Sequence, residues 1–193
     1  MINHYFSIPL YYKEKAFLPS ETEQINKCFM DLKEQERLTT FNGSAKLSFN
    51  TPVRSILDDY DLVNIKEKIK RYCKLYITGL NHRVKEIELT QDWVIGYSKN
   101  DHQGEHSHGN HDFSITGIIY TKVPTNSSPV VFTTPNPYAT HICAAYTHSA
   151  AYVPSEGMLI LFPSFLRHSV PINKNILETD LRICLSFNAM ILQ

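Results

Sequence analysis

The chain has 193 residues, of which 42% are hydrophobic, and its 19 basic and 19 acidic side chains give a formal net charge of zero. This size and composition are those of one globular domain, which we expect to span residues 1–193. A balanced charge excludes a general affinity for nucleic-acid backbones or anionic lipid surfaces.

The amino terminus and the cysteines indicate the cellular compartment. Residues 1–12, MINHYFSIPLYY, contain no basic segment followed by an apolar core, and no stretch approaches the ~20 apolar residues of a membrane span. The four cysteines show no CxxC pair, which favours buried, reduced thiols. We therefore expect a soluble protein of the cytoplasm.

The first half of the chain has helical patterns. Ser20 and Glu23 match a capping box, and apolar residues follow at helical spacing up to Leu32. A second stripe starts at about Asp59 and stops in the run 79–81. We expect both helices to be structural, because such stripes are usually packing surfaces.

The second half has the pattern of short strands separated by turn residues. The expected strands are residues 92–99, 112–123, 129–134, 150–153, 157–163 and 180–192. So many short strands in so short a segment predict a sandwich or barrel. We predict an α+β fold in which a mainly helical segment, residues 1–90, supports a double-stranded β-helix, or jelly roll, over residues 91–193.

Residues 105–112, EHSHGNHD, are rich in histidine. In an extended segment His106 and His108 project from the same side, so both imidazoles can reach one metal ion. The alternative is a polar surface loop that happens to contain histidines. His168 follows the apolar run 157–163 and its terminating Pro163, and a jelly roll can bring these two strand ends together. The pattern predicts a metal site of His106, His108 and His168.

Arg182 and Ser186 lie on one face of an otherwise apolar strand, because polar and apolar residues alternate from Arg182 to Phe187. An inward guanidinium needs a partner, and its planar donors match a carboxylate. Arg182 is therefore a candidate to bind the far carboxylate of a dicarboxylic cosubstrate that chelates the metal. The alternatives are a structural ion pair and an outward-facing arginine.

Four segments together resemble a known family. These are WVIGYSKNDHQGEHSH (93–108), SITGIIY (114–120), PSEGMLILFPSFLRH (154–168) and RICLSFN (182–188). They are similar to the 2-oxoglutarate/Fe(II) oxygenases common in phages and marine bacteria. The resemblance implies Fe(II) and 2-oxoglutarate as cofactors, O2 as cosubstrate, and hydroxylation of a substrate coupled to decarboxylation of 2-oxoglutarate to succinate.

The resemblance also implies roles for single residues. His106, His108 and His168 take the metal-ligand positions. Arg182 and Ser186 take the positions that bind the cosubstrate carboxylate. A phenol hydrogen bond to the cosubstrate comes from Tyr97 or Tyr120.

Two questions stay open at this point. Enzymes of this kind commonly use two histidines and one carboxylate, whereas this chain has HxH with Asp112 four residues after His108. Either the site is all-histidine, or Asp112 is a ligand and one early histidine only supports the site.

The second question is the protein class, because the HxH-x3-Asp spacing also resembles a cupin metal enzyme or binding protein. Against the cupin reading, His168 lies 11 residues after Gly157, further than the second cupin segment allows. A non-catalytic phage jelly roll is a third reading. The primary substrate is not indicated by any motif.

Overall fold

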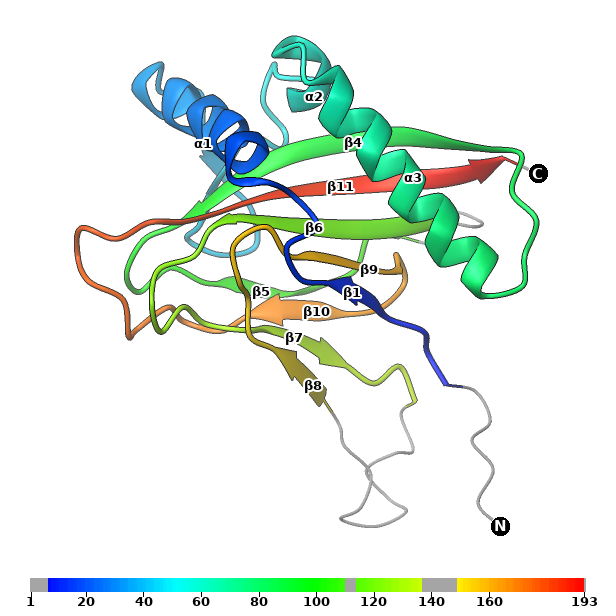
Figure 1. Cartoon of the computed structure of the whole chain (residues 1–193). Coiled ribbons are helices and arrows are strands. Elements are labelled where there is room, and N and C mark those ends of the chain that lie inside the picture. The colour runs from blue at the N-terminus through cyan, green and yellow to red at the C-terminus, as the bar shows by residue number, and fades with distance from the viewer. Residues whose placement is uncertain (1–6, 110–113, 137–148, 193) are drawn as a thin grey trace.

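The computed structural model describes residues 7–109, 114–136 and 149–192. Two antiparallel sheets lie one above the other (Figure 1), with strand orders β1-β9-β6-β11-β4-β3-β2 and β5-β10-β7-β8. The larger sheet contains β1 (Tyr11–Lys13), β2 (Thr39–Thr40), β3 (Lys46–Leu47), β4 (Glu86–Tyr97), β6 (Ser114–Lys122), β9 (Leu159–Pro163) and β11 (Arg182–Leu192). The smaller contains β5 (Gln103–His106), β7 (Val130–Thr133), β8 (Ser149–Tyr152) and β10 (His168–Val170). This arrangement is the predicted jelly roll.

Three helices cover the outer face of the larger sheet (Figure 1): α1 (Pro19–Glu34), α2 (Ile56–Asp59) and α3 (Val63–Gly79). The predicted start of the first helix was wrong by two residues. The Glu21 carboxylate, rather than that of Glu23, accepts a 2.6 Å hydrogen bond from the Leu18 backbone N–H. The reason is Pro19, whose fixed φ and missing N–H suit the first helical position.

The second predicted helix begins at Val63, about four residues after the expected start at Asp59. A short α2 precedes α3, and Ser55 caps α2 by accepting from the Asp58 N–H at 3.1 Å. The predicted stop is confirmed, because α3 ends at Gly79 and Asn81 follows in the left-handed region with φ 61°.

The first half contributes more sheet than its helical pattern indicated. β4 begins at Glu86, six residues before the expected start at Asp92. Its added residues pair with the end of β11, for example Ile87 with Ile191. β3 pairs with β4 through Leu47 and Ile95. Strands of two residues such as β2 and β3 are too short to show a period.

Two hydrophobic cores result from these layers. One lies between the helices and the larger sheet and contains Ile183, Leu185 and Phe187 of β11. The other lies between the sheets and contains Cys184 from the opposite face of the same strand. The predicted alternation along β11 is therefore confirmed.

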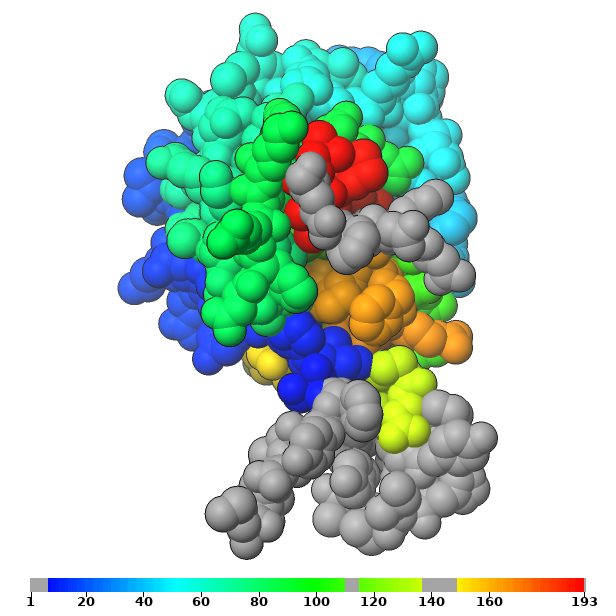
Figure 2. Space-filling view, turned by 90° about the vertical axis from the view of Figure 1, so that its right-hand side faces the viewer, coloured from blue at the N-terminus to red at the C-terminus, as the bar shows by residue number. Residues whose placement is uncertain are grey.

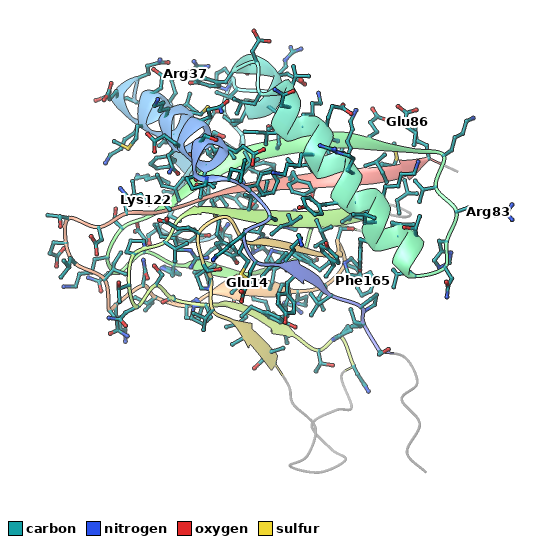
Figure 3. All side chains as sticks on the ribbon, in the orientation of Figure 1. Glu14, Arg37, Arg83, Glu86, Lys122 and Phe165 are labelled. Atoms are coloured by element: carbon teal, nitrogen blue, oxygen red, sulfur yellow. The ribbon has the colours of Figure 1, made fainter. Side chains whose placement is uncertain are left out.

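Charged side chains of the helices and of the segment that leads into β4 lie on the outer surface. Arg37, Arg83 and Glu86 project away from the sheets (Figure 3). Among the described residues, no helix is long and apolar enough to cross a membrane.

Candidate active site

Strand pairing brings three histidines together. β5 and β10 run antiparallel with His106 directly opposite His168, and their ring centroids are 4.3 Å apart. His108 follows β5, and its backbone N–H donates to the Ser164 carbonyl at 2.9 Å. One possible ligand atom from each of the three histidines lies within 4.8 Å of the other two.

Hydrogen bonds orient two of these rings. The Nδ1 atom of His106 is 2.9 Å from the Gly104 carbonyl, and that of His168 is 3.0 Å from the Leu166 carbonyl. A carbonyl only accepts, so each Nδ1 carries the proton and each Nε2 presents a lone pair.

The nitrogen separation fits a metal ion. His108 Nε2 and His168 Nε2 lie 3.3 Å apart. Two nitrogens bound to one ion at about 2.1 Å lie about 3 Å from each other. His106, His108 and His168 therefore fit an iron(II) centre.

The protonation states also suit metal binding. Burial lowers the pKa of His106 below its usual value. Burial, with a smaller effect of neighbouring histidines, lowers the pKa of His108 to about 4 and that of His168 to about 3. All three imidazoles are therefore neutral at neutral pH, the form that binds a metal.

These shifts predict how the stability of the metal-free protein depends on pH. Histidine in the unfolded chain titrates near pH 6.5, whereas His108 in the folded chain titrates at about 4. Between these values the unfolded state binds more protons, so the free energy of unfolding falls as the pH falls from about 6.5 to 4. We expect a lower urea midpoint at pH 5 than at pH 7.5.

His108→Asn provides the control, because asparagine does not titrate. The variant is expected to lose part of the difference between the two midpoints. An identical pH dependence in wild type and variant would contradict the prediction.

A cavity of about 240 Å³ lies beside the histidines, between the two sheets. Arg182 lines it and is 1% exposed. The guanidinium donates from Nη1 to the Ser128 carbonyl at 2.6 Å, while its Nε has no hydrogen-bond partner among the described residues. It lies 4.8 Å from the ring centroid of Tyr97 and 5.2 Å from that of Tyr120.

Within the described part of the chain, no carboxylate forms an ion pair with Arg182. An unpaired buried cation is costly, and an anionic ligand removes that cost. Arg182 therefore points inward, and it forms no ion pair with a described residue, in contrast to the two alternatives considered from the sequence.

The predicted tyrosines flank this arginine. Tyr97 lines the cavity and donates from its hydroxyl to Gln103 Oε1 at 3.1 Å. The buried Tyr120 hydroxyl has no hydrogen-bond partner in the described part of the chain, and this residue is not part of the cavity lining. Burial raises the pKa of both phenols, so each remains a hydrogen-bond donor. Ser186 lines the cavity on the same face of β11 as Arg182.

Sequence reasoning missed part of the lining. Phe41, Leu47 and Phe49 come from the half assigned to structural support, and nothing in their local pattern marks them. Trp93 stacks on His108 at 5.5 Å and 19°. The alternation along β4, which places Trp93 on the same face as Tyr97, was a usable signal for this residue.

Asp112, the alternative metal ligand predicted from the sequence, lies outside the described residues.

A jelly roll with three converging histidines and a buried arginine in one cavity fits the class of non-haem metal-dependent oxygenases. The family model described as "Putative 2OG-Fe(II) oxygenase" matches residues 91–188, just over half of the chain. The chain belongs to this family and is a 2-oxoglutarate/Fe(II)-dependent oxygenase. The cupin and non-catalytic alternatives are therefore set aside. No curated protein matches the sequence.

Solved structures support the fold. An oxidoreductase of the 2OG-Fe(II) oxygenase family from Burkholderia pseudomallei has TM-score 0.67 and 12% identity, covering 94% of this chain and 85% of that one. A prolyl-4-hydroxylase from Pseudomonas putida has TM-score 0.60 and 12% identity, with coverages of 97% and 94%. HygX from Streptomyces hygroscopicus, solved with nickel and 2-oxoglutarate bound, has TM-score 0.61 and 10% identity, with coverages of 95% and 83%.

Proposed function

We propose that this enzyme hydroxylates its substrate at an iron(II) ion held by His106, His108 and His168, with 2-oxoglutarate anchored by Arg182. The observation that carries this assignment is a buried guanidinium in the cavity beside the three histidines, with no carboxylate partner among the residues that the structure describes. A dicarboxylate satisfies both requirements, because one end can chelate the metal while the other neutralises the arginine.

The protein contributes positioning and exclusion of water. The Gly104 and Leu166 carbonyls hold the rings of His106 and His168 through Nδ1. Gln103 accepts from Tyr97 and thereby fixes one wall of the arginine site. When bound, iron(II) and 2-oxoglutarate would supply the oxidising chemistry: 2-oxoglutarate loses CO2 and takes up one atom of O2 to become succinate, and the other atom is inserted into a C–H bond of the substrate.

Ser186 and Tyr120 are proposed as further contacts of the cosubstrate carboxylate. Ser186 lines the cavity, and the buried Tyr120 hydroxyl has no hydrogen-bond partner among the described residues. A cosubstrate carboxylate bound at Arg182 would give this buried hydroxyl an acceptor if the hydroxyl moved toward it.

Thermal stability tests the cosubstrate assignment. Under anaerobic conditions, 2-oxoglutarate at about 100 times its Kd should raise the Tm of the Fe(II)-loaded protein by about 5 °C or more, because it binds only the folded state. Succinate should have a weaker effect, since it lacks the keto oxygen. If Fe(II) binds and millimolar 2-oxoglutarate leaves Tm unchanged, the assignment is wrong.

We further propose that the enzyme works in the cytoplasm. Cys28, Cys73 and Cys184 are free and buried. Burial raises the pKa of Cys28 and Cys184 to about 11, so these thiols stay protonated and poorly reactive. Free thiols of this kind suit a reducing compartment.

A further inference from the structure

The inward face of the larger sheet continues well beyond Arg182. Arg182 and Asn188 lie on the same face of β11, six residues apart, which corresponds to about 20 Å along a strand. A five-carbon dicarboxylate is much shorter than this distance. Arg182 is buried at its end, whereas Asn188 is half-buried and its neighbour Gln91 is exposed. Figure 2 shows the C-terminal end of β11, in red, at the molecular surface.

A row of hydrogen-bonded polar side chains crosses three strands at the open end. Asn188 is paired with Gln91 of β4 and with Thr116 of β6. The Thr116 hydroxyl donates to Asn188 Oδ1 at 3.0 Å, and Asn188 Nδ2 donates to Gln91 Oε1 at 3.1 Å. This amide row (Gln91, Asn188, Thr116) fixes the orientation of the Gln91 amide. Its Nε2 makes no hydrogen bond to any other described residue and is available to an incoming acceptor.

An aromatic wall lines the same cavity. Phe41 and Phe49 have ring centroids 5.6 Å apart, and Phe49 and Trp93 are 5.2 Å apart. Trp93 in turn stacks on His108. Exposure decreases along this aromatic wall (Phe41, Phe49, Trp93), from 45% at Phe41 to 7% at Trp93. The wall therefore leads from the surface to a histidine of the metal centre.

The lining has no charge to offer a charged substrate. Of the described residues that line the cavity, Arg182 alone carries a full charge at neutral pH, and the proposed function assigns it to 2-oxoglutarate. A charged substrate group entering here loses its hydration without gaining a partner.

We propose that the space between the aromatic wall and the amide row binds the primary substrate through an uncharged, flat or aliphatic group that bears one hydrogen-bond acceptor. This inference rests on the proposed function, because it takes Arg182 and the metal to be occupied by the cosubstrate. The apolar body lies on Phe41, Phe49 and Trp93, and the acceptor receives a hydrogen bond from Gln91 Nε2.

An isosteric series of probes tests the proposal. The protein is loaded with 2-oxoglutarate and Ni(II), a redox-inert substitute for Fe(II), and titrated with benzamide, benzoate and benzamidine. Trp93 is the only tryptophan of the chain, so its fluorescence reports binding at the aromatic wall. Benzamide is expected to bind at least about tenfold more tightly than either charged analogue.

Variants separate the two contacts. Phe41→Ala should weaken benzamide binding by about tenfold through loss of a ring contact, and Gln91→Ala by about fivefold through loss of one hydrogen bond. Phe165→Ala is the matched control. Phe165 is 50% exposed, similar to the 45% of Phe41, but it does not line the cavity. It should leave the affinity unchanged.

Three outcomes count against the proposal. If benzoate or benzamidine binds as tightly as benzamide and responds in the same way to Phe41→Ala, the site does not select an uncharged group, and this part of the proposal is overturned. Absence of benzamide binding to protein that has taken up 2-oxoglutarate would overturn this site alone. Failure to take up Ni(II) and 2-oxoglutarate would overturn the proposed function and this inference with it.

Discussion

Replacing any one of His106, His108 and His168 by alanine is expected to lower the affinity for iron(II) by more than about 100-fold. Each imidazole is neutral, His168 is buried, and His106 and His108 are half-buried. The three are close enough to reach one ion. With one ring removed, only two of these imidazoles would remain to hold the ion. Anaerobic titration with Fe(II), followed by measurement of bound metal, gives the affinity of each variant.

His102→Ala and Asp112→Ala are the controls for this prediction. His102 belongs to the same histidine-rich segment, but its Nδ1 lies 3.3 Å from the Ser44 hydroxyl and it does not line the cavity. Its removal should leave iron binding unchanged. Asp112→Ala should reduce affinity by about tenfold or less, through lost support of a histidine. If Asp112→Ala eliminates binding while His106 or His108 proves dispensable, the ligand set is two histidines and one carboxylate.

Arg182→Met is expected to weaken 2-oxoglutarate binding by about 100-fold or more while iron affinity stays near that of wild type. Methionine fills a similar volume but removes two charge-assisted hydrogen bonds to the far carboxylate. Lysine at this position should restore only part of the affinity, because an ammonium group lacks the planar pair of donors. Calorimetric titration of the Ni(II)-loaded variants with 2-oxoglutarate measures these affinities.

The stability of the cosubstrate-free variant separates this role from a structural one. Arg182 has no described carboxylate partner, so Arg182→Met should melt within a few degrees of wild type when 2-oxoglutarate is absent. Arg167→Met is the matched control, since Arg167 pairs with Glu105 at 2.8 Å on the surface. It should bind 2-oxoglutarate normally. Unfolding of Arg182→Met, or loss of its iron, would mark Arg182 as a structural residue.

The sequence by itself determined the features that depend on local periodicity. A strand repeats every two residues, so the placement of Arg182 and Ser186 opposite Ile183 and Phe187 followed from their order alone. The stripe of α1 and the apolar β9 were predictable for the same reason. The number of short strands indicated a sandwich or barrel, and the need to bring two strand ends together indicated a jelly roll. The oxygenase family followed from the resemblance of four segments to that family. The roles of single residues in the site stay predictions.

Only the tertiary structure decided which distant residues meet. The pairing of His106 with His168 joins two short strands far apart in the chain, and no local pattern specifies a partner strand. The absence of a described carboxylate beside Arg182 likewise depends on every segment that surrounds it. Phe41 and Phe49 reach the cavity because β3 joins β4. Such contacts arise from long-range packing of segments whose own sequences are compatible with many partners, and this is why they became visible only in the folded chain.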